Sequence, residues 1–334
     1  MSPLVSVIIP CYNAELWVKQ CIQSALDQTY SPIEIIVIDD GSTDKSLEVI
    51  KSFGDKITWE TGPNRGANHA RNRGLDLAKG DYLQFLDADD YLLPEKIERQ
   101  MKVFPSSGAD VIYEDWQRME EKPDGSCHWF SSISGGHPDI LEAFLGYWVP
   151  QVLTVLYARR TFEKGIRWNE KMTSAQDLEM HVRLAMAGVT YTYLPGCFTV
   201  IRRPPVPTVS TRNPRQLEDN IVGILKSAEA RLTESGLMKD RYKRAMASAY
   251  LSMACGTNRY FDRDRRRFDE LLLQAQRLSP SYVYPYSAFY ILMGKIFGVR
   301  TAERLRSFKR RWFEPPGRPQ MVSVVNGRQE TVQN

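Results

Sequence analysis

The sequence FLDADD, residues 85–90, places three carboxylates within four positions directly after an apolar run. Their mutual repulsion is costly unless water or a cation offsets it. Asp87 and Asp89, in D-x-D spacing, can point the same way from a turn and share a hard divalent cation. Mn²⁺ or Mg²⁺ prefers such oxygen ligands and keeps positions open for phosphate oxygens. The triplet equally fits a solvated acidic turn before the helix expected at Pro94.

A second acidic pair, Asp39 and Asp40, follows the apolar run 35–38 and precedes GSTD at 41–44. A carboxylate is a good acceptor for a nucleobase ring N–H or for ribose hydroxyls. Gly41 allows a tight turn, and one side chain within 42–44 is expected to cap the next helix. Capping explains 42–44 well but explains the aspartate pair poorly.

Two more segments carry polar residues at expected helix starts. Residues 64–74, NRGANHARNRG, combine arginines with side-chain amides, and Arg71 is able to reach a phosphate or a ribose. Residues 174–181, SAQDLEMH, place Asp177 in the first turn of a helix, where the helix dipole favours a carboxylate. A solvated helical face for the first segment and a simple cap for the second are the alternatives.

The elements that must position these side chains alternate along the first hundred residues. Apolar, strand-like runs stand at 4–9, 33–38, 57–61 and 82–86. Helical spacing of apolar residues is found at 14–27, 43–53 and 67–78, and Pro94 opens a further helix to 104. Apolar strands alternating with helices predict a parallel sheet covered on both faces. Ligands bind beyond the carboxyl ends of such strands, so we expect residues 10–13, 39–44 and 87–90 to meet at one edge.

The pattern loosens after about residue 111. Residues 114–130 contain the turn signal PDG and are expected to form a hairpin or an excursion, 152–157 is strand-like, and 174–188 is helical. Prolines after Arg202 predict a linker. We therefore divide the chain into an α/β domain (1–203), a proline-rich linker (204–214), a mostly helical region (215–313) and a disordered tail (314–334).

Composition sets outer limits on the class of protein. The chain has 334 residues, of which 43% are apolar and 25% charged, which is ordinary for a soluble globular protein and excludes wholesale disorder, collagen-like repeats and a polytopic membrane protein. The net charge of +4 is low for a dedicated nucleic-acid binder, so no nucleic-acid partner is expected. Five cysteines without a CxxC pair favour a reducing compartment, the cytoplasm.

Missing sequence signals narrow the expectation further. No run of about 18 or more apolar residues is present, so no membrane-spanning helix is expected. The N-terminal MSPLVSVIIPCYN lacks the basic region that opens a signal peptide. Neither GxGxxG after a strand nor GxxxxGK[ST] occurs, which excludes the dinucleotide fingerprint and the P-loop. The diphosphate of a nucleotide would need another cradle, and a metal held by the D-x-D pair provides one.

Together, the segments VSVIIPCYN, IEIIVIDDGSTD, NRGANHARNRG and FLDADD, in this order and spacing, resemble the family 2 glycosyltransferases of the GT-A fold over residues 3–203. The resemblance implies an α/β fold with a Rossmann-like, mixed and mainly parallel sheet flanked by helices, and the C-terminal extension is expected to be mostly α-helical. It also implies metal-dependent, inverting transfer of a sugar from a nucleotide-diphosphate sugar, UDP favoured, to an acceptor hydroxyl. The acceptor would be a saccharide or a lipid-linked saccharide in surface polysaccharide or glycolipid biosynthesis.

The resemblance also assigns roles to individual residues. Those that match the nucleotide site are Pro10, Tyr12, Asn13, Asp39, Asp40, Arg71 and Asp87. Among them Asp40 matches the acid that accepts from the base. Asp87 and Asp89 match the D-x-D metal motif, with Asp89 as the expected direct ligand. Asp177 matches the aspartate of a Glu-Asp pair, taken as the general base, and Gln176 stands where the family has glutamate.

Alternatives to this function remain open. The QxxRW motif of processive synthases is absent, since prolines follow Arg202 and Arg203, which argues against a cellulose-synthase-like polymerase. A sugar nucleotidyltransferase would need a glycine-rich loop with a basic residue after the first strand, where this chain has PCYN. A non-catalytic sugar-nucleotide-binding relative is left open by Gln176, although the intact aspartates of both motifs oppose it.

The last third of the chain carries a different signal. Residues 281–299 are aromatic and apolar, and 300–311 carry six cations against one glutamate. Such a pairing suits the surface of an anionic membrane and would place the protein peripherally on its inner face. A helix packed on the catalytic domain, with a solvated basic face, is the alternative. For the acceptor, we expect part of the site within 114–147, where aromatic side chains that suit sugar rings are Trp116, Trp129, Phe130 and Tyr147.

Overall fold

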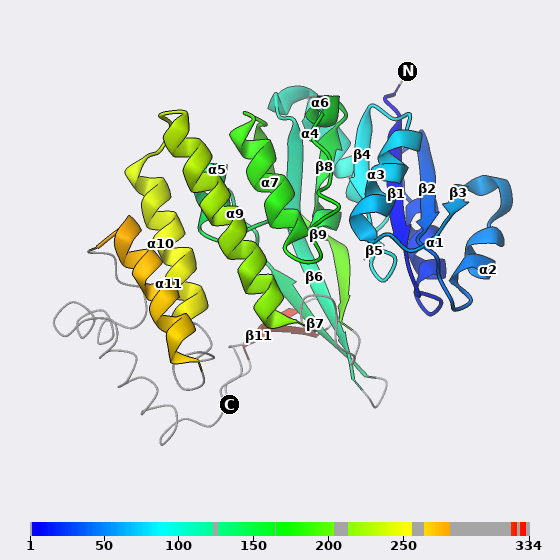
Figure 1. Ribbon diagram of the computed structural model, residues 1–334. Helices are drawn as coiled ribbons and strands as arrows, with labels where there is room; N and C mark the ends of the chain where they lie inside the picture. The colour runs from blue at the N-terminus through cyan, green and yellow to red at the C-terminus, as the bar shows by residue number, and fades with distance from the viewer. Residues whose placement is uncertain are drawn as a thin grey trace. The chain divides into compact units, whose positions relative to one another are not determined.

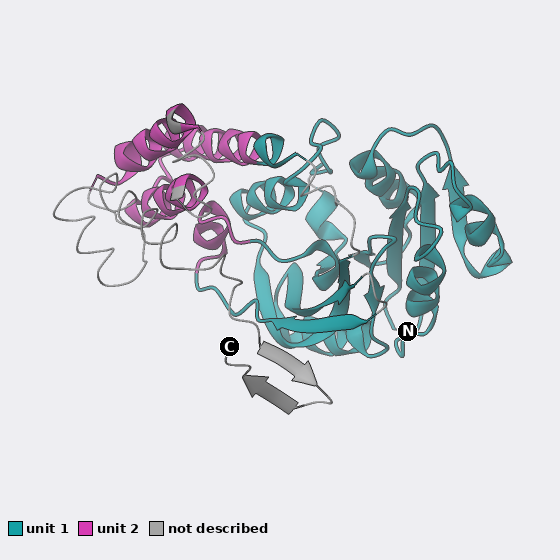
Figure 2. Cartoon of the chain, turned by 90° about the horizontal axis from the view of Figure 1, so that it is seen from below, with its two compact units in different colours: residues 1–138, 149–217, 322–334 teal, residues 139–148, 218–321 magenta. Residues whose placement is uncertain are grey.

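The computed structural model describes residues 2–122, 126–163, 165–203, 213–255 and 264–280, and two short strands near the C-terminus (Figure 1). The chain forms two compact units (Figure 2). The first consists of residues 1–138, 149–217 and 322–334, and the second of 139–148 and 218–321. Most of the expected linker, the segment 281–311 and most of the tail lie outside the described residues.

A parallel sheet forms the first half of the first unit. Its strands are β1 (Val5–Cys11), β2 (Ile33–Asp39), β3 (Thr58–Thr61) and β4 (Tyr82–Phe85), in the order β4-β1-β2-β3. Val5 of β1 is in register with Ile33 of β2 and with Tyr82 of β4. All seven residues of β1 are buried, as expected for a strand covered on both faces. The predicted parallel sheet is therefore confirmed.

Helices follow these strands as the periodicity predicted, with shifted starts. They are α1 (Val18–Leu26), α2 (Ser46–Lys51), the short 3₁₀ helix η1 (Gly54–Lys56), α3 (Ala67–Leu77) and α4 (Lys96–Ser107). The expected start of α1 at residue 14 is wrong, because Ala14–Trp17 form a turn in which the Trp17 amide donates to the Ala14 carbonyl over 2.9 Å. Helix α2 begins at Ser46, three residues later than predicted. The Ser46 amide donates to Asp44 Oδ1 at 2.9 Å, and the Ser46 Oγ accepts from the Ala14 amide at 2.8 Å.

Helix α3 approaches strand β1 closely at Gly74, a residue of the arginine-rich segment 64–74. A Cβ on Gly74 of α3 would lie 2.3 Å from Cγ2 of Ile8 in β1. Only glycine permits this packing distance without displacing the strand. Helix α3 is thereby held directly against the central strand, which fixes the position of its Arg71.

The second half of the unit makes the sheet mixed. The long hairpin of β6 (Val111–Glu121) and β7 (Cys127–Ser132) is antiparallel, and β8 (Leu156–Ala158) pairs antiparallel with both β4 and β6. Strand β9 (Tyr191–Arg203) runs parallel to β6, and the short β5 (Tyr91–Leu92) pairs with it. The hairpin expected at 114–130 is confirmed. Strand β9 was not expected, and the strand expected at 152–157 is replaced by the 3₁₀ helix η2 (Val152–Thr154) followed by β8.

The remaining helices of this unit are α6 (Arg160–Glu163) and α7 (Gln176–Met186). Near the C-terminus, β10 (Val322–Val325) and β11 (Arg328–Thr331) form an antiparallel pair, and Ser323 is in register with Phe130 of β7. These two strands fall within the tail that was expected to be disordered.

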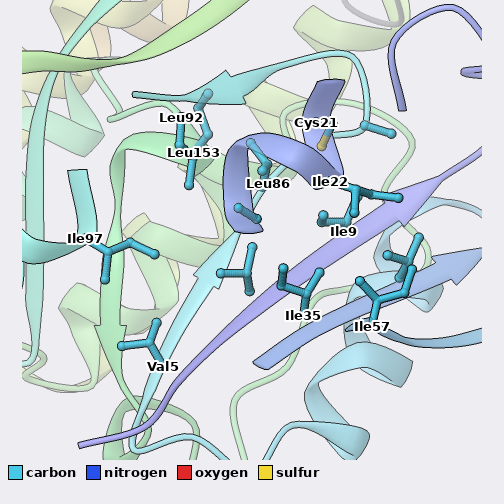
Figure 3. Packing of buried hydrophobic residues seen from close by; sticks show 14 of the residues in the cluster. Val5, Ile9, Cys21, Ile22, Ile35, Ile57, Leu86, Leu92, Ile97 and Leu153 are labelled. Atoms are coloured by element: carbon cyan, nitrogen blue, oxygen red, sulfur yellow. The ribbon is translucent and has the colours of Figure 1, made fainter. Parts of the chain in front are cut away.

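The core of the first unit anchors the D-x-D loop. Leu86 at its start and Leu92 at its end are both buried in the cluster that Ile9 of β1, Ile22 of α1 and Ile97 of α4 also join (Figure 3). Burying one such leucine contributes about 1.5–3 kcal/mol relative to exposing it. The acidic residues between the two leucines are thus held at the sheet by apolar packing on either side.

The second unit is helical. Its helices are α5 (Ile140–Leu145), most of α9 (Pro214–Glu234), α10 (Asp240–Cys255) and α11 (Arg265–Leu278). Asp139 caps α5 by accepting from the Glu142 amide, and it also accepts from the Tyr242 hydroxyl of α10 over 3.0 Å. The predicted mostly helical region after the α/β domain is confirmed. Among the helices that the structure describes, none combines the length and apolarity needed to cross a bilayer.

Candidate active site

The sequence-predicted residues gather at one edge of the parallel sheet. Strands β4, β1 and β2 are neighbours and run the same way, so the segments that follow them emerge together. Two backbone hydrogen bonds extend this alignment past the strand ends: the Asp40 amide donates to the Cys11 carbonyl at 2.8 Å, and the Leu86 amide to the Ile8 carbonyl at 3.0 Å. The expected juxtaposition of residues 10–13, 39–44 and 87–90 is confirmed.

After β1, the Tyr12 ring is exposed, and Asn13 is fixed by a hydrogen bond to the next loop. Pro10 is buried inside the strand, paired with Ile38, whereas Tyr12 is 50% exposed. Asn13 has a left-handed φ of 49°, and its Oδ1 accepts from the Thr43 amide over 2.8 Å. Asn13 therefore ties the first and second loops together, while the Tyr12 ring is available for stacking with a base.

The aspartate pair after β2 is buried and bonded to neutral donors. Asp39 accepts from the Thr61 hydroxyl at 2.6 Å, and the two oxygens of Asp40 accept from the backbone amides of Arg65 and Gly66, each at 2.8 Å. The pair thereby fixes the loop before α3, a role that helix capping does not describe. Each carboxylate oxygen can accept more than one hydrogen bond, so a nucleobase N–H can still be bound there.

Arg71 is the centre of the polar cluster on the other side of this edge. It is only 4% exposed, and its guanidinium donates to Asn68 Oδ1 at 3.0 Å, to Gln176 Oε1 at 2.9 Å and to Asp87 Oδ1 at 2.7 Å. Its plane lies over the Trp168 ring, with Cζ 4.8 Å from the ring centroid. Arg71 thus joins α3, the D-x-D loop and the start of α7.

The two other carboxylates of FLDADD have different environments. Burial and the nearby Asp87 charge raise the pKa of Asp89 to about 6, against the opposing effect of Arg203 and Arg202. Asp90 is buried and accepts from the Arg202 amide at 2.8 Å, and the Arg202 guanidinium donates to the Asp89 carbonyl at 2.9 Å. Asp90 therefore holds the loop, and Asp89 is the carboxylate whose ionisation a cation would favour.

Asp177 lies in the first turn of α7, where the sequence placed it. Burial raises its pKa to about 6, the Arg71 cation acts against this shift, and the Asp87 charge adds to it. The raised pKa makes its carboxylate more basic than an ordinary aspartate, yet ionised at neutral pH. Desolvation together with a specific charge partner is typical of functional carboxylates.

A metal at this site would need ligands from outside the protein. The described residues hold no group of three or more His, Cys, Asp or Glu side chains arranged to bind a metal ion. The oxygen donors of Asp87 and Asp89 suit Mn²⁺ or Mg²⁺, and such ions retain positions for phosphate oxygens. The donor set therefore fits a cation that binds together with a nucleotide diphosphate.

Some residues of the cluster had no sequence signal. Asn68 and Trp168 contact Arg71, and Arg202 reaches the D-x-D loop from more than a hundred positions away in sequence. Only Asn68 belongs to a segment that the sequence singled out. Of the expected acceptor-site aromatics, Trp116 packs against the core, Phe130 lies under the Arg118 guanidinium, and Tyr147 is 39% exposed in the second unit.

Comparison with known sequences agrees with this geometry. The family model described as Glycosyl transferase family 2 matches residues 6–125. An uncharacterized glycosyltransferase of Haemophilus influenzae is 50% identical over 103 residues, which are 30% of this chain and 41% of that protein. The chondroitin synthase of Pasteurella multocida is 33% identical over 192 residues, 56% of this chain and 19% of the synthase. The matched part thus spans less than half of either relative.

Solved structures show the same fold. Residues 1–349 of S. aureus TarS, in complex with UDP-GlcNAc, superpose with a TM-score of 0.65 over 99% of this chain and 97% of that one, at 17% identity. The mannosyltransferase PcManGT of Pyrobaculum calidifontis, in complex with GDP-Man and Mn²⁺, gives a TM-score of 0.54 over 94% and 89% of the two chains, also at 17% identity. Residues 6–125 therefore resemble the family 2 glycosyltransferases, and the mixed sheet has the GT-A fold of these solved structures.

Proposed function

We propose that the protein is a metal-dependent, inverting glycosyltransferase that moves a sugar from a nucleotide-diphosphate sugar, a UDP-sugar in the first instance, to a hydroxyl of a saccharide or lipid-linked saccharide. The observation that carries the proposal is the cluster in which buried Arg71 pairs with Asp87 and lies beside Asp177, whose pKa burial raises to about 6 against the effect of Arg71. This cluster stands at the sheet edge where ligands of such folds bind. The family match supports the reaction class.

Donor recognition is assigned to the first two strand ends. The half-exposed Tyr12 ring offers a stacking face, and buried Asp40 has acceptor capacity for a ring N–H beside its two backbone donors. Uracil, thymine and guanine all carry such an N–H. We favour UDP because TarS was crystallised with UDP-GlcNAc, while PcManGT, with a lower TM-score, holds GDP-Man.

Asp87 and Asp89 are the residues that would hold the metal. When bound, Mn²⁺ or Mg²⁺ stabilises the negative charge that develops on the departing diphosphate. Arg71 keeps one oxygen of Asp87 oriented by their 2.7 Å ion pair. Because Leu86 and Leu92 anchor the loop, the two carboxylates are held in place before any ligand arrives.

Asp177 is assigned as the general base. The acceptor hydroxyl is weakly acidic, so a carboxylate within hydrogen-bond reach must take its proton as the oxygen attacks the anomeric carbon. The bond from that carbon to the diphosphate breaks on the opposite face, which inverts the configuration. One carboxylate suffices for this reaction, and no covalent sugar intermediate on the protein is needed.

A donor screen tests the proposal. The purified full chain is incubated with UDP-GlcNAc, UDP-glucose, UDP-galactose or GDP-mannose and Mn²⁺, and nucleotide release and thermal stabilisation are measured. We expect one UDP-sugar to raise the melting temperature and to be turned over slowly by water or rapidly with an acceptor. EDTA and the Asp89→Asn variant should abolish release. Equal release with EDTA would refute the metal role, and no stabilisation by any nucleotide would refute the donor class.

We further propose that the protein works at the cytoplasmic face of a membrane, in surface polysaccharide or glycolipid synthesis. The support is the sequence of 281–311, in which an aromatic, apolar stretch precedes a cationic one. Co-sedimentation of the full chain with vesicles that contain or lack anionic lipid tests this proposal. We expect binding to anionic vesicles that falls with added salt. Equal recovery with neutral vesicles would reject it.

A further inference from the structure

Gln176, the residue before Asp177, makes two side-chain hydrogen bonds, one as an acceptor and one as a donor. Gln176 Oε1 accepts from the Arg71 guanidinium at 2.9 Å, and Gln176 Nε2 donates to the Met172 carbonyl at 3.0 Å. A guanidinium only donates and a carbonyl only accepts, so these two partners determine which end of the amide faces which way. The amide is therefore used at both ends.

A carboxylate of the same length would not fit these partners. Glutamate at this position could accept from Arg71, but its second oxygen would face the Met172 carbonyl oxygen with no proton between them. Two acceptors held against each other are destabilising, and the Met172 carbonyl would lose the 3.0 Å bond and keep the longer one from Asn68 Nδ2 at 3.4 Å. The local structure of this chain is thus built for glutamine.

The Met172 carbonyl belongs to a loop that is held firmly to α3. Asn72 bonds the Trp168 backbone twice, accepting from its amide and donating to its carbonyl, each at 2.9 Å. Asn68 donates to the Asn169 carbonyl at 2.7 Å. Residues 168–172 are therefore a fixed support, and a hydrogen bond to Met172 connects α7 to it.

Besides Gln176, the first turn of α7 is bonded to this support by Glu179, whose Oε1 accepts from Asn169 Nδ2 at 3.3 Å. The N-cap residue itself, Ala175, has a left-handed φ of 54° and makes no side-chain capping bond. A left-handed alanine costs about 1–2 kcal/mol, so neighbouring contacts must stabilise this turn. The bond from Gln176 back to Met172 spans that turn, and Asp177 is the next residue.

We propose that Gln176 is a positioning residue whose amide ties the helix bearing Asp177 to both Arg71 and the Met172 support. The clamp couples the base to the D-x-D loop, because the same guanidinium holds Asp87. The amide is uncharged, so it adds no third carboxylate to Asp87 and Asp177, which both act electrostatically on Arg71. The catalytic part of this inference rests on the proposed function.

Three variants of the full chain test the clamp. Gln176→Met keeps the length and removes both hydrogen bonds, and Gln176→Glu keeps the acceptor for Arg71 but loses the donor to Met172. The matched control is Gln274→Met on α11 of the second unit, where a glutamine Oε1 also accepts from an arginine, at 3.3 Å from Arg277 Nε. Hydrogen–deuterium exchange and donor turnover are measured for each.

For Gln176→Met we expect amides of residues 173–180 to exchange about tenfold faster, while those of β1 are unchanged, because the turn loses its connection to Met172. Turnover number should fall about tenfold with the donor KM within about twofold, since Arg71 keeps its ion pair with Asp87. Gln176→Glu should lie between Gln176→Met and the parent in exchange, and Gln274→Met should match the parent in both measurements.

The two assignments can fail separately. Should the parent turn over no sugar nucleotide, the proposed function fails, and the exchange rates alone decide whether Gln176 holds the turn. Unchanged exchange at 173–180 in Gln176→Met, with turnover within twofold of the parent, would overturn the positioning role while leaving the transferase assignment intact.

Discussion

Two acidic groups stand at the same sheet edge and are satisfied in opposite ways. Asp39 and Asp40 accept from a hydroxyl and from backbone amides, which are neutral donors fixed by the fold. Asp87 and Asp177 share one buried cation, Arg71, while Asp89 lies beside Asp87 and is acted on by Arg203 and Arg202. Burial raises the pKa of both Asp89 and Asp177 to about 6. The first group is bonded to donors of the fold, whereas in the second group burial disfavours the ionised forms of Asp89 and Asp177.

These different partners determine what each acidic group can do. A carboxylate held by neutral donors is a rigid acceptor that recognises a base without changing its own protonation. Carboxylates that lack sufficient compensation favour binding a cation or a proton, which is what metal binding and general base catalysis require. Substitutions in each group should therefore have different effects on stability and turnover.

Removing the Arg71 cation should destabilise the protein through the second acidic group. Arg71→Met keeps much of the side-chain volume but leaves Asp87 without its ion-pair partner and Asp177 without its nearby cation, so the free energy of unfolding should fall by about 3–5 kcal/mol at pH 7.5. The loss should be smaller at pH 5, because Asp177 then takes up a proton. Urea unfolding at both pH values checks this, and an equal loss at the two pH values would contradict the electrostatic explanation.

Single aspartate-to-asparagine changes should have opposite signs in the two groups. Asp40→Asn turns an acceptor oxygen into a donor against a backbone amide and should destabilise the fold by about 1–3 kcal/mol. Asp89→Asn should raise the melting temperature of the metal-free protein at pH 7.5. Because folding raises the pKa of Asp89, its ionisation opposes folding above the ordinary pKa of an aspartate, and the gain should vanish when pH falls below that value.

The control for this pair is Asp55→Asn, an exposed position in η1, which should change stability by less than about 0.5 kcal/mol. Differential scanning fluorimetry with EDTA measures all three variants. A loss of stability in Asp89→Asn as large as that in Asp40→Asn would show that the two groups are alike and would remove the distinction.

The pH dependence of the turnover number should reflect the ionisation of Asp177, a member of the second group. Asp177 must be ionised to act as a base, and its pKa is raised to about 6. With saturating donor and Mn²⁺, the turnover number should fall about tenfold per pH unit below 6 and level off above it. A profile that is flat between pH 5 and 7 would mean that no group with this pKa acts as the base.

The smallest effect is expected away from the sheet edge. Arg277 of α11 pairs with Glu229 of α9 at 2.6 Å in the second unit, and its side chain is 48% exposed. Exposed ion pairs contribute about 0–1 kcal/mol. Arg277→Met should therefore change stability by less than about 1 kcal/mol and leave turnover as it was, and a loss of turnover would link this helix to the reaction.

Much of the fold followed from periodicity. Most of the parallel strands were predicted from short runs rich in apolar residues, and the strand ends located Asp39, Asp40, Asp87 and Asp89 at one edge. Helix α2 was predicted to begin three residues too early, and its first residue, Ser46, accepts from the Ala14 amide through its Oγ. Strand β9 was missed because only part of it is buried, and its proline and glycine interrupt the apolar pattern.

The site was less predictable than the sheet, because its contacts join distant positions. Arg71 and Gln176 are 105 residues apart, and Asp90 and Arg202 are 112 apart, so no local pattern pairs them. The sequence did single out Gln176 as a departure from the family's glutamate. Only the structure shows the hydrogen bond that the Gln176 amide donates to the Met172 carbonyl.

The most direct test of the account is the Asp177→Asn variant, compared with Glu179→Gln in the same helical turn. UDP and Mn²⁺ binding by calorimetry and turnover of the accepted UDP-sugar are measured for both. We predict that Asp177→Asn lowers turnover by about 10²- to 10⁴-fold and keeps UDP affinity within about threefold, while Glu179→Gln retains most of its turnover. Normal turnover by Asp177→Asn would contradict the central claim that this carboxylate is the base.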